Sequence, residues 1–322
     1  MRPMIRIGLF VRGTLGSAAT VIVTAIIALG ASGCTTNKTQ SNSAQSLARQ
    51  GRELTNAEEF QLDAALEVLV KKCANEAGFP YWVGPVASVT ERKGWGYVLD
   101  DVAWAKKHGY GGQFKQQAEK LRLNDRNIAY ANTLPHKERI RYINVLDGGP
   151  SGGMLSTELP SGGTLRTPRE GCRAKAKGQL YGNFETWFRV ESISTNLNPL
   201  YLPYLVRDED FIQGLRDWSS CMREKGYDYA SPSDIRTELP QLTKDLSKGE
   251  AHSVEVEIAV DEAMCARVTS FAETARTLEG EYRDKWTHRY REDTSLYQHM
   301  RLAGLTQAKV IAAEYPNVRN QA

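Results

Sequence analysis

Two segments of this chain share an unusual pattern, and that pattern constrains how two of its helices must end. Cys73 and Cys221 are each followed by four residues, a glycine, an aromatic residue, one further residue and a tyrosine. A glycine at this position takes the left-handed conformation that commonly ends a helix, and an apolar residue after it folds back onto the last turn. We therefore expect two helices with the same C-terminal structure, in which Phe79 and Tyr227 cover the two cysteines.

Both segments follow sequences with the apolar periodicity of a helix. Thr55 and Glu58 have the spacing of a capping box, which marks the start of the first helix. Three acidic residues at 208–210 suit the start of the second, where negative charge is favourable. The apolar stripes of the two helices are Leu62, Leu66, Leu69 and Cys73 in the first, and Phe211, Leu215, Trp218 and Met222 in the second.

The N-terminus has the composition of a secretory leader. Three arginines precede an uncharged stretch over 13–37, which contains an apolar run and the small residues Ala31, Ser32 and Gly33 directly before Cys34. This end is similar to the lipobox of bacterial lipoproteins, although alanine stands at residue 31 where leucine is usual. The resemblance implies that 1–33 is a signal peptide and that Cys34 carries diacylglycerol. The protein is then expected on the outside of the cell membrane, held there by its N-terminal lipid.

Two other interpretations of the leader stay open. The uncharged stretch is long enough to remain as an uncleaved membrane anchor, and ordinary cleavage near residues 31–33 would release the protein. Residues 34–54 are rich in polar side chains with little to bury, so we expect a flexible tether between the anchor and the folded body.

The charge balance argues against a nucleic-acid partner. The chain has 41 basic and 38 acidic residues, and three of the basic residues lie in the leader. The remainder has 38 of each and a formal net charge of zero. Neither the basic surface of a nucleic-acid-binding protein nor a polybasic membrane patch is indicated.

Four cysteines remain in the body of the chain once Cys34 is set aside. An even number in an exported protein favours two disulfides. We favour Cys73–Cys172 and Cys221–Cys265 among the three possible pairings, because they close the shorter loops. Four free thiols and a zinc site are the alternatives, but no two cysteines have the Cys-x-x-Cys spacing typical of zinc ligands.

The paired helix ends resemble those of uncharacterised secreted lipoproteins of actinobacteria. The resemblance extends to the segments around 170–182, 218–222 and 258–265, and spans most of the region from Cys73 to Cys265. It implies an envelope location and a helical fold, and it implies no activity.

The remaining sequence predicts a mainly α fold, a helical bundle of two lobes with one small β-hairpin. Helices are expected over 113–131 and from Pro135 to about residue 146, and a hairpin over 155–167. A short helix should run from Cys172 to about 181, and 196–203 should be a connector. Between Pro240 and Pro316, a heptad seam predicts one long helix or a pair broken near Gly280.

The expected organisation is a tether over 34–54, an N-terminal lobe over 55–195, a C-terminal lobe over 196–304 and a short helix or tail over 305–322.

Two sets of residues are candidates for function. Trp82, Trp95, Tyr97 and Trp104 fall in an aromatic-rich stretch and could stack on a sugar or grip a peptide, or could fill the core of the first lobe. Asp261 interrupts the heptad seam, so it is a buried site carboxylate, one half of an ion pair, or the acceptor of a nearby backbone donor.

No enzyme signature is present. The five histidines have no metal-ligand spacing, and neither a nucleophile elbow nor a phosphate-binding loop occurs. We expect no cofactor. The leading hypothesis is a non-enzymatic envelope protein that binds a partner protein or ligand. The alternative is a cell-wall or peptide hydrolase that uses a carboxylate such as Asp261.

Overall fold

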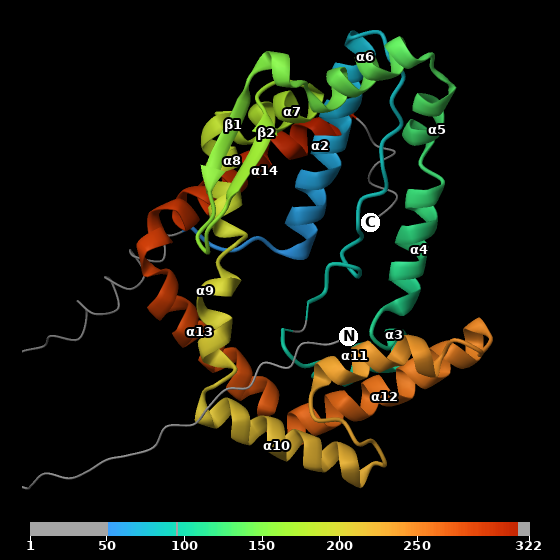
Figure 1. Cartoon of the computed structure of the whole chain (residues 1–322), viewed down its shortest axis with the longest axis vertical. Coiled ribbons are helices and arrows are strands. Elements are labelled where there is room, and N and C mark those ends of the chain that lie inside the picture. The colour runs from blue at the N-terminus through green and yellow to red at the C-terminus, as the bar shows by residue number, and fades with distance from the viewer. Residues whose placement is uncertain (1–50, 95, 315–322) are drawn as a thin grey trace, which may run out of the picture. The chain divides into compact units, whose positions relative to one another are not determined.

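The computed structural model describes residues 51–94 and 96–314, and over these residues the chain is mainly helical (Figure 1). One antiparallel hairpin is the sheet of the described part. The fold class predicted from the sequence is therefore confirmed. The elements in chain order are α2 (Asn56–Glu76), α3 (Val102–His108), α4 (Gly112–Leu123), α5 (Arg126–Thr133), α6 (His136–Asp147), a 3-10 turn η1 (Pro150–Gly152), β1 (Met154–Glu158), β2 (Thr164–Pro168), α7 (Cys172–Tyr181), α8 (Phe184–Ser194), α9 (Asn198–Leu205), α10 (Glu209–Glu224), α11 (Pro232–Leu242), α12 (Lys248–Val268), α13 (Phe271–Thr287), a second 3-10 turn η2 (His288–Tyr290) and α14 (Arg291–Glu314).

The two repeated helix ends have the same hydrogen-bond pattern, as the sequence predicts. Gly78 and Gly226 both have left-handed backbones, with φ of 84° and 93°. After α2, the amide of Phe79 donates to the carbonyl of Ala74 at 2.9 Å, and after α10 the equivalent bond is 3.0 Å long. This six-residue closure is the Schellman motif, which satisfies carbonyls that the helix itself leaves free.

Both predicted disulfides are present. Cys73–Cys172 joins the last turn of α2 to the first residue of α7, and Cys221–Cys265 joins α10 to α12. The sulfur–sulfur contacts close loops of 99 and 44 residues. Each disulfide lies beside a different hydrophobic core.

The first core forms where α2 packs against α7 and α14, with α8 also packed against α14 (Figure 1). Trp187 of α8 is almost fully buried there, and its ring stacks on that of Tyr181 at 3.5 Å between centroids. Other buried members of this core include Leu62, Val68, Phe79, Tyr142, Cys172, Leu305 and Ile311.

The second core forms among α3, α9, α10, α12 and α13. Five large side chains of this core are completely or almost completely buried: Trp218, Tyr201, Phe211, Phe271 and Met222. Gly214 lets α13 approach α10 closely, because a Cβ there would lie 2.8 Å from the ring of Phe271. The predicted stripe of α10 thus faces this core.

The two cores are not contiguous in sequence. Leu99, Trp104 and Tyr110 belong to the second core, although the predicted N-terminal lobe runs over 55–195. Conversely, α14 begins at Arg291 and packs on the first core, although 196–304 is the predicted C-terminal lobe. The predicted boundaries at 196 and 305 therefore do not separate the two cores.

The helix predicted over 113–131 is two helices. α4 ends at Leu123 and α5 begins at Arg126. The carboxylate of Asp125 accepts the amide of Asn127 at 2.7 Å, and the side chain of Asn124 donates to a carbonyl of α4. Asn and Asp side chains compete with helical backbone bonds in this way, so the pair ends one helix and starts the next.

The predicted connector over 196–203 is instead largely helical, because α9 covers Asn198–Leu205. Pro199 stands in the first turn, where a missing amide hydrogen costs nothing. Tyr201 and Leu205 of α9 are buried in the second core. Burial of these side chains against α13 explains why two prolines do not prevent the helix.

The long C-terminal helical region breaks at places other than Gly280, which lies inside α13. The first break is at Ser270, the one described non-glycine residue with a left-handed backbone. There the Thr269 hydroxyl also donates to the carbonyl of Cys265 at 2.7 Å. The second break is the 3-10 turn η2.

The hairpin was predicted correctly, with Leu155 opposite Thr167 in its register.

Candidate binding sites

Asp261 lies in an ion pair. Its Oδ1 is 2.8 Å from the Nζ of Lys225, and the two side chains are 22% and 29% exposed. Lys225 is the residue that follows the last turn of α10. The pair therefore ties α12 to the end of α10, which is the structural role that the sequence leaves open for Asp261.

The buried carboxylate of this region belongs to the next residue, Glu262, whose side chain is completely buried. Its Oε1 accepts hydrogen bonds from the Leu99 amide at 2.9 Å and from Nη2 of Arg236 at 2.8 Å. Its Oε2 accepts a bond from the Tyr110 hydroxyl at 2.6 Å. A buried carboxylate is costly unless it is paired and hydrogen-bonded. Glu262 is both, and it joins three separate segments to α12.

Glu255 lies two helical turns before Glu262, on the same face of α12. Its Oε1 accepts the backbone amides of Tyr110 and Gly112, both at 2.8 Å. A Cβ on Gly109 or on Gly112 would come within 2.6 Å of the Glu255 side chain. The turn over 109–112 needs glycine at these two positions because it wraps around the carboxylate.

Burial sets the protonation of two groups beside this turn. Burial and the neighbouring Glu262 carboxylate raise the pKa of the Tyr110 hydroxyl far above its ordinary value. The hydroxyl therefore stays a hydrogen-bond donor at every physiological pH. Burial also lowers the pKa of His108, whose Nδ1 lies 2.9 Å from the side-chain nitrogen of Gln113. A neutral imidazole suits its position against the ring of Trp104.

A cavity of about 690 Å³ lies among α4, α11 and α12, and we call it the α4–α11–α12 cavity. The buried Tyr110 and Glu255 form part of its wall. The rest of the lining comes from Gly112, Gln113, Lys115 and Gln116 of α4, Arg236, Leu239 and Pro240 of α11, Thr243, and Lys248, Gly249, Ala251 and His252 of α12.

Positive charge predominates in this cavity. Lys115, Arg236 and Lys248 are cationic, and Glu255 is its one acid; Arg236 is paired with Glu262 behind the wall, which leaves the two lysines as the cations without an ion pair among the described residues. One oxygen of Glu255 is occupied by two amides, and the other lies 4.0 Å from Nδ1 of His252. α11 adds apolar surface. Cavities of this size with a few placed polar groups bind small molecules, and this lining suits an anion with an apolar part.

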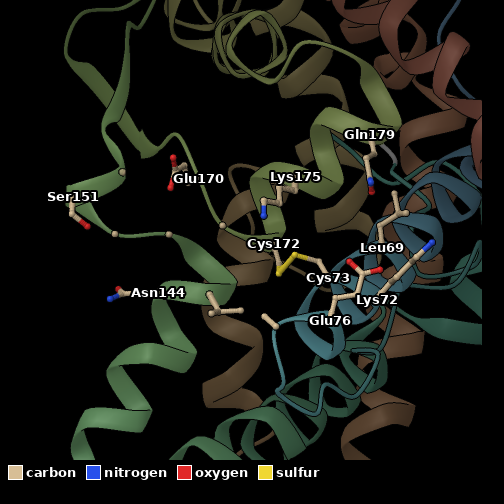
Figure 2. A pocket seen from close by; sticks show the side chains of 16 residues that line it. Leu69, Lys72, Cys73, Glu76, Asn144, Ser151, Glu170, Cys172, Lys175 and Gln179 are labelled. Atoms are coloured by element: carbon tan, nitrogen blue, oxygen red, sulfur yellow. A yellow bond between two sulfur atoms is a disulfide. The ribbon is translucent and has the colours of Figure 1, made fainter.

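A second cavity of about 580 Å³ lies where the end of α2 meets the start of α7 and the loop after α6 (Figure 2); we call it the disulfide cavity. Cys73 and Cys172 both line it. Two backbone segments meet at its edge, since a Cβ on Gly148 would lie 2.1 Å from the carbonyl oxygen of Glu170. Four of the residues that line the cavity are charged, two of each sign: Lys72, Glu76, Glu170 and Lys175. We call them the rim charges.

The aromatic candidates have different partners and do not form one surface. Tyr97 packs edge-on against Phe211 at 4.8 Å between centroids, and Trp104 is only 9% exposed in the second core. Trp82 instead packs against Tyr130, at 5.8 Å. Tyr97 and Trp104 therefore have a packing role, but in the second core and not in the core of the predicted first lobe.

Trp82 is half-buried beside α5. The guanidinium carbon of Arg126 lies 4.7 Å from its ring centroid, and its backbone exchanges two hydrogen bonds with the side chain of Asn127. Trp95 and Cys34, also singled out from the sequence, lie outside the described residues.

Sequence reasoning missed Glu255 and Glu262 because it placed the buried face of α12 one residue away. The predicted seam runs through Val254, Ile258 and Asp261, whereas the buried face includes Glu255, Ile258 and Glu262. Two acids seven residues apart on the same face as small apolar residues were the available signal.

Two further observations concern metal ligands and membrane spans. Over 51–94 and 96–314, no cluster of three or more His, Cys, Asp or Glu residues could hold a metal ion. Within the same residues, no helix is both long and apolar enough to cross a bilayer. The stretch over 13–37 lies outside them.

Comparison of the chain with protein-family models, with curated proteins and with solved structures finds no match. The resemblance to secreted actinobacterial lipoproteins therefore stays a prediction.

Proposed function

We propose that this chain is an extracytoplasmic binding protein of the cell envelope, anchored by lipid at Cys34, with the α4–α11–α12 cavity as its ligand site. The two disulfides indicate an oxidising environment outside the cytoplasm. The leader and the cysteine directly after its small residues support anchoring.

The observation that carries the binding role is how two carboxylates are held: Glu255, the one acid that lines the cavity, and Glu262, which lies behind Tyr110 and Arg236 of the lining. Glu255 and Glu262 accept hydrogen bonds from backbone amides, the Tyr110 hydroxyl and Arg236. A general acid or base must exchange a proton with its substrate. Glu262 is fully buried, and both of its carboxylate oxygens accept hydrogen bonds from groups inside the protein. Glu255 forms part of the wall and Glu262 holds the Tyr110 and Arg236 side chains that line it, so both carboxylates support the shape of the cavity, which favours binding over catalysis.

The alternative is a cell-wall or peptide hydrolase that uses Asp261 or another carboxylate. Asp261 does not support it, because that residue is paired with Lys225. No observation on the described residues favours the hydrolase over a binding role.

The ligand class follows from the lining. Lys115 and Lys248 provide positive charge, since Arg236 is paired with Glu262, and the Leu239 and Pro240 side chains provide apolar contact. We propose a small anionic ligand with an apolar part, since charge-assisted hydrogen bonds to a carboxylate or phosphate are the stronger polar contacts in such sites.

Calorimetric titration of the mature protein tests this role with four named probes. Octanoate and glucose 6-phosphate represent the two anion types, and octanamide and glucose are their neutral counterparts. We expect at least one anion to bind, and at least about ten-fold more tightly than its neutral counterpart. Equal binding of both members of each pair, or no binding by any probe, would contradict the proposed site.

A pair of variants locates the binding. Lys115→Gln combined with Lys248→Gln removes two cations from the cavity and should weaken anion binding by about ten-fold or more. Lys120→Gln is the control, because Lys120 is exposed on the same helix and does not line the cavity. An equal loss in both variants would place the binding elsewhere.

Anchoring has its own test. Cys34→Ala removes the proposed lipid attachment, and the protein should then leave the membrane fraction while its folded body stays intact. A variant that stays in the membrane as firmly as the unmodified chain would show that lipid at Cys34 is not the anchor.

A further inference from the structure

The Cys73–Cys172 disulfide is open to a small reactant from one side. Both cysteines line the disulfide cavity, which has a volume of about 580 Å³ (Figure 2). Cys172 is 2% exposed, whereas Cys73 is only half-buried. A molecule in the cavity therefore reaches the sulfur of Cys73 more readily than that of Cys172.

The two sulfurs differ in how well they would hold a negative charge. Cys172 is the first residue of the ten-residue helix α7, and no side chain of the described residues caps that helix. The free amides of a first turn stabilise an anion, and cysteines at this position have lowered thiol pKa values. Lys175 stands one turn further along α7 and also lines the cavity.

Cys73 has the opposite surroundings. It lies in the last turn of α2, where the helix carbonyls disfavour negative charge. Glu76 stands one turn on and lines the same cavity, with Lys72 beside it. In thiol–disulfide exchange, the sulfur of the more acidic thiol leaves faster. The asymmetry thus favours attack on Cys73 with departure of Cys172.

The second disulfide differs in its helix positions. Cys221 and Cys265 each lie in the last turn of their helices, so neither thiolate gains from a helix N-terminus. Its burial is similar to that of the first disulfide, because Cys221 is partly buried, as Cys73 is, and Cys265 is completely buried. The chain therefore contains its own control for the reactivity of the first disulfide.

We propose that Cys73–Cys172 is a thiol–disulfide exchange site for a low-molecular-weight thiol, independently of ligand binding in the α4–α11–α12 cavity. The thiolate of the reactant attacks Sγ of Cys73 and forms a new sulfur–sulfur bond there. The Cys73–Cys172 bond breaks, and its electron pair leaves on Sγ of Cys172. The products are a mixed disulfide at Cys73 and a thiolate at Cys172, with no other oxidant or reductant required.

The rim charges indicate the kind of thiol. Lys72 and Lys175 are cationic and Glu76 and Glu170 are anionic, and no ion pair joins any of them to another described residue. Such a rim suits a reactant that carries both ammonium and carboxylate groups. Glutathione has both, and 2-mercaptoethanol has neither.

Mass spectrometry after timed exposure of the native mature protein to glutathione, followed by alkylation, measures the exchange at each cysteine. We expect a glutathione adduct on Cys73 and an alkyl group on Cys172, at a rate at least ten-fold above that of the Cys221–Cys265 pair. This ratio should be smaller with 2-mercaptoethanol. Equal rates at both disulfides, reaction only in denaturant, or an adduct mainly on Cys172 would overturn the proposal.

Two charge variants separate reactivity from stability. Lys175→Gln should slow the exchange several-fold, because it removes the cation beside the leaving sulfur, and Glu76→Gln should accelerate it. Lys177→Gln is the control, since Lys177 pairs with Glu191 and does not line the cavity. Rate changes of the same sign in all three variants would contradict the proposed role of these charges.

Discussion

Neighbouring carboxylates on α12 occupy opposite environments. Asp261 faces partly outward and pairs with Lys225, whereas Glu262 points into the protein and accepts three hydrogen bonds. A partly exposed ion pair contributes little to stability because solvent screens it. Removing one member of a buried network leaves other groups without partners, which costs far more.

The first prediction compares these two residues. Glu262→Gln should lower the free energy of unfolding by about 3 kcal/mol. Arg236 would lose its ion-pair partner, and the new amide nitrogen, which cannot accept a hydrogen bond, would face one of the buried donors that now bond to Glu262. Asp261→Asn should lower it by less than about 1 kcal/mol. Urea unfolding of both variants checks this, and similar losses would contradict the assigned environments.

A second prediction concerns pH at the start of α2. Hydrogen bonds from Arg52 and from the Thr55 amide lower the pKa of Glu58 to about 2, from its ordinary value of 4.5. Because the pKa is lower in the folded state, the stabilisation is complete above pH 4.5 and disappears as the pH falls towards 2. An NMR titration of the Glu58 side chain should show this midpoint, and a midpoint near 4.5 would contradict it.

At the scale of elements, two glycines inside helices have opposite surroundings. Nothing lies within 4 Å of a Cβ built on Gly280 in α13. A Cβ built on Gly304 in α14 would lie 3.0 Å from the Leu180 carbonyl oxygen and 3.0 Å from the Tyr181 ring. The first glycine only weakens its helix, whereas the second lets α14 pack closely on α7.

The third prediction uses this contrast. Gly280→Ala should stabilise the protein by about 1 kcal/mol through helix propensity. Gly304→Ala should destabilise it by about 1 kcal/mol. The steric cost of overpacking, about 2 kcal/mol, is larger than the gain of about 1 kcal/mol in helix propensity. Thermal and urea unfolding measure both. Destabilisation by Gly280→Ala would instead favour the helix break that the sequence predicted there.

Local signals explain which elements the sequence predicts well. The two Schellman ends, the Thr55–Glu58 capping box and the hairpin each depend on residues within a few positions of one another. The helix breaks near Asp125 and Ser270 were missed, as was α9. α9 forms because Tyr201 and Leu205 find buried positions against distant helices, which no local pattern reveals.

At the scale of the whole described body, each core has one disulfide beside it. The Cys73–Cys172 and Cys221–Cys265 loops span 99 and 44 residues, and closing loops of this size restricts the unfolded chain. The packing of Glu262 with Leu99, Tyr110 and Arg236 likewise joins segments far apart in sequence. The pairing of the four cysteines could be predicted from loop length. The hydrogen-bond network of Glu262 could not, because its partners come together only in the folded chain.

A fourth prediction follows for the disulfides. Replacing both members of either pair by serine should lower the free energy of unfolding by about 4 kcal/mol, and slightly more for the longer loop. Hydrogen exchange should show that protection falls first in the core beside the lost disulfide. A loss below about 1 kcal/mol for either pair would mean that this disulfide does not stabilise its core.

Peptide mapping by mass spectrometry of the protein isolated from a cell that exports it tests the central claim most directly, because one measurement covers the anchor and both crosslinks. We predict a chain that begins at Cys34 with a diacylglycerol modification, and linked peptides for Cys73–Cys172 and Cys221–Cys265. A chain with an unmodified Cys34 and four free thiols would contradict it.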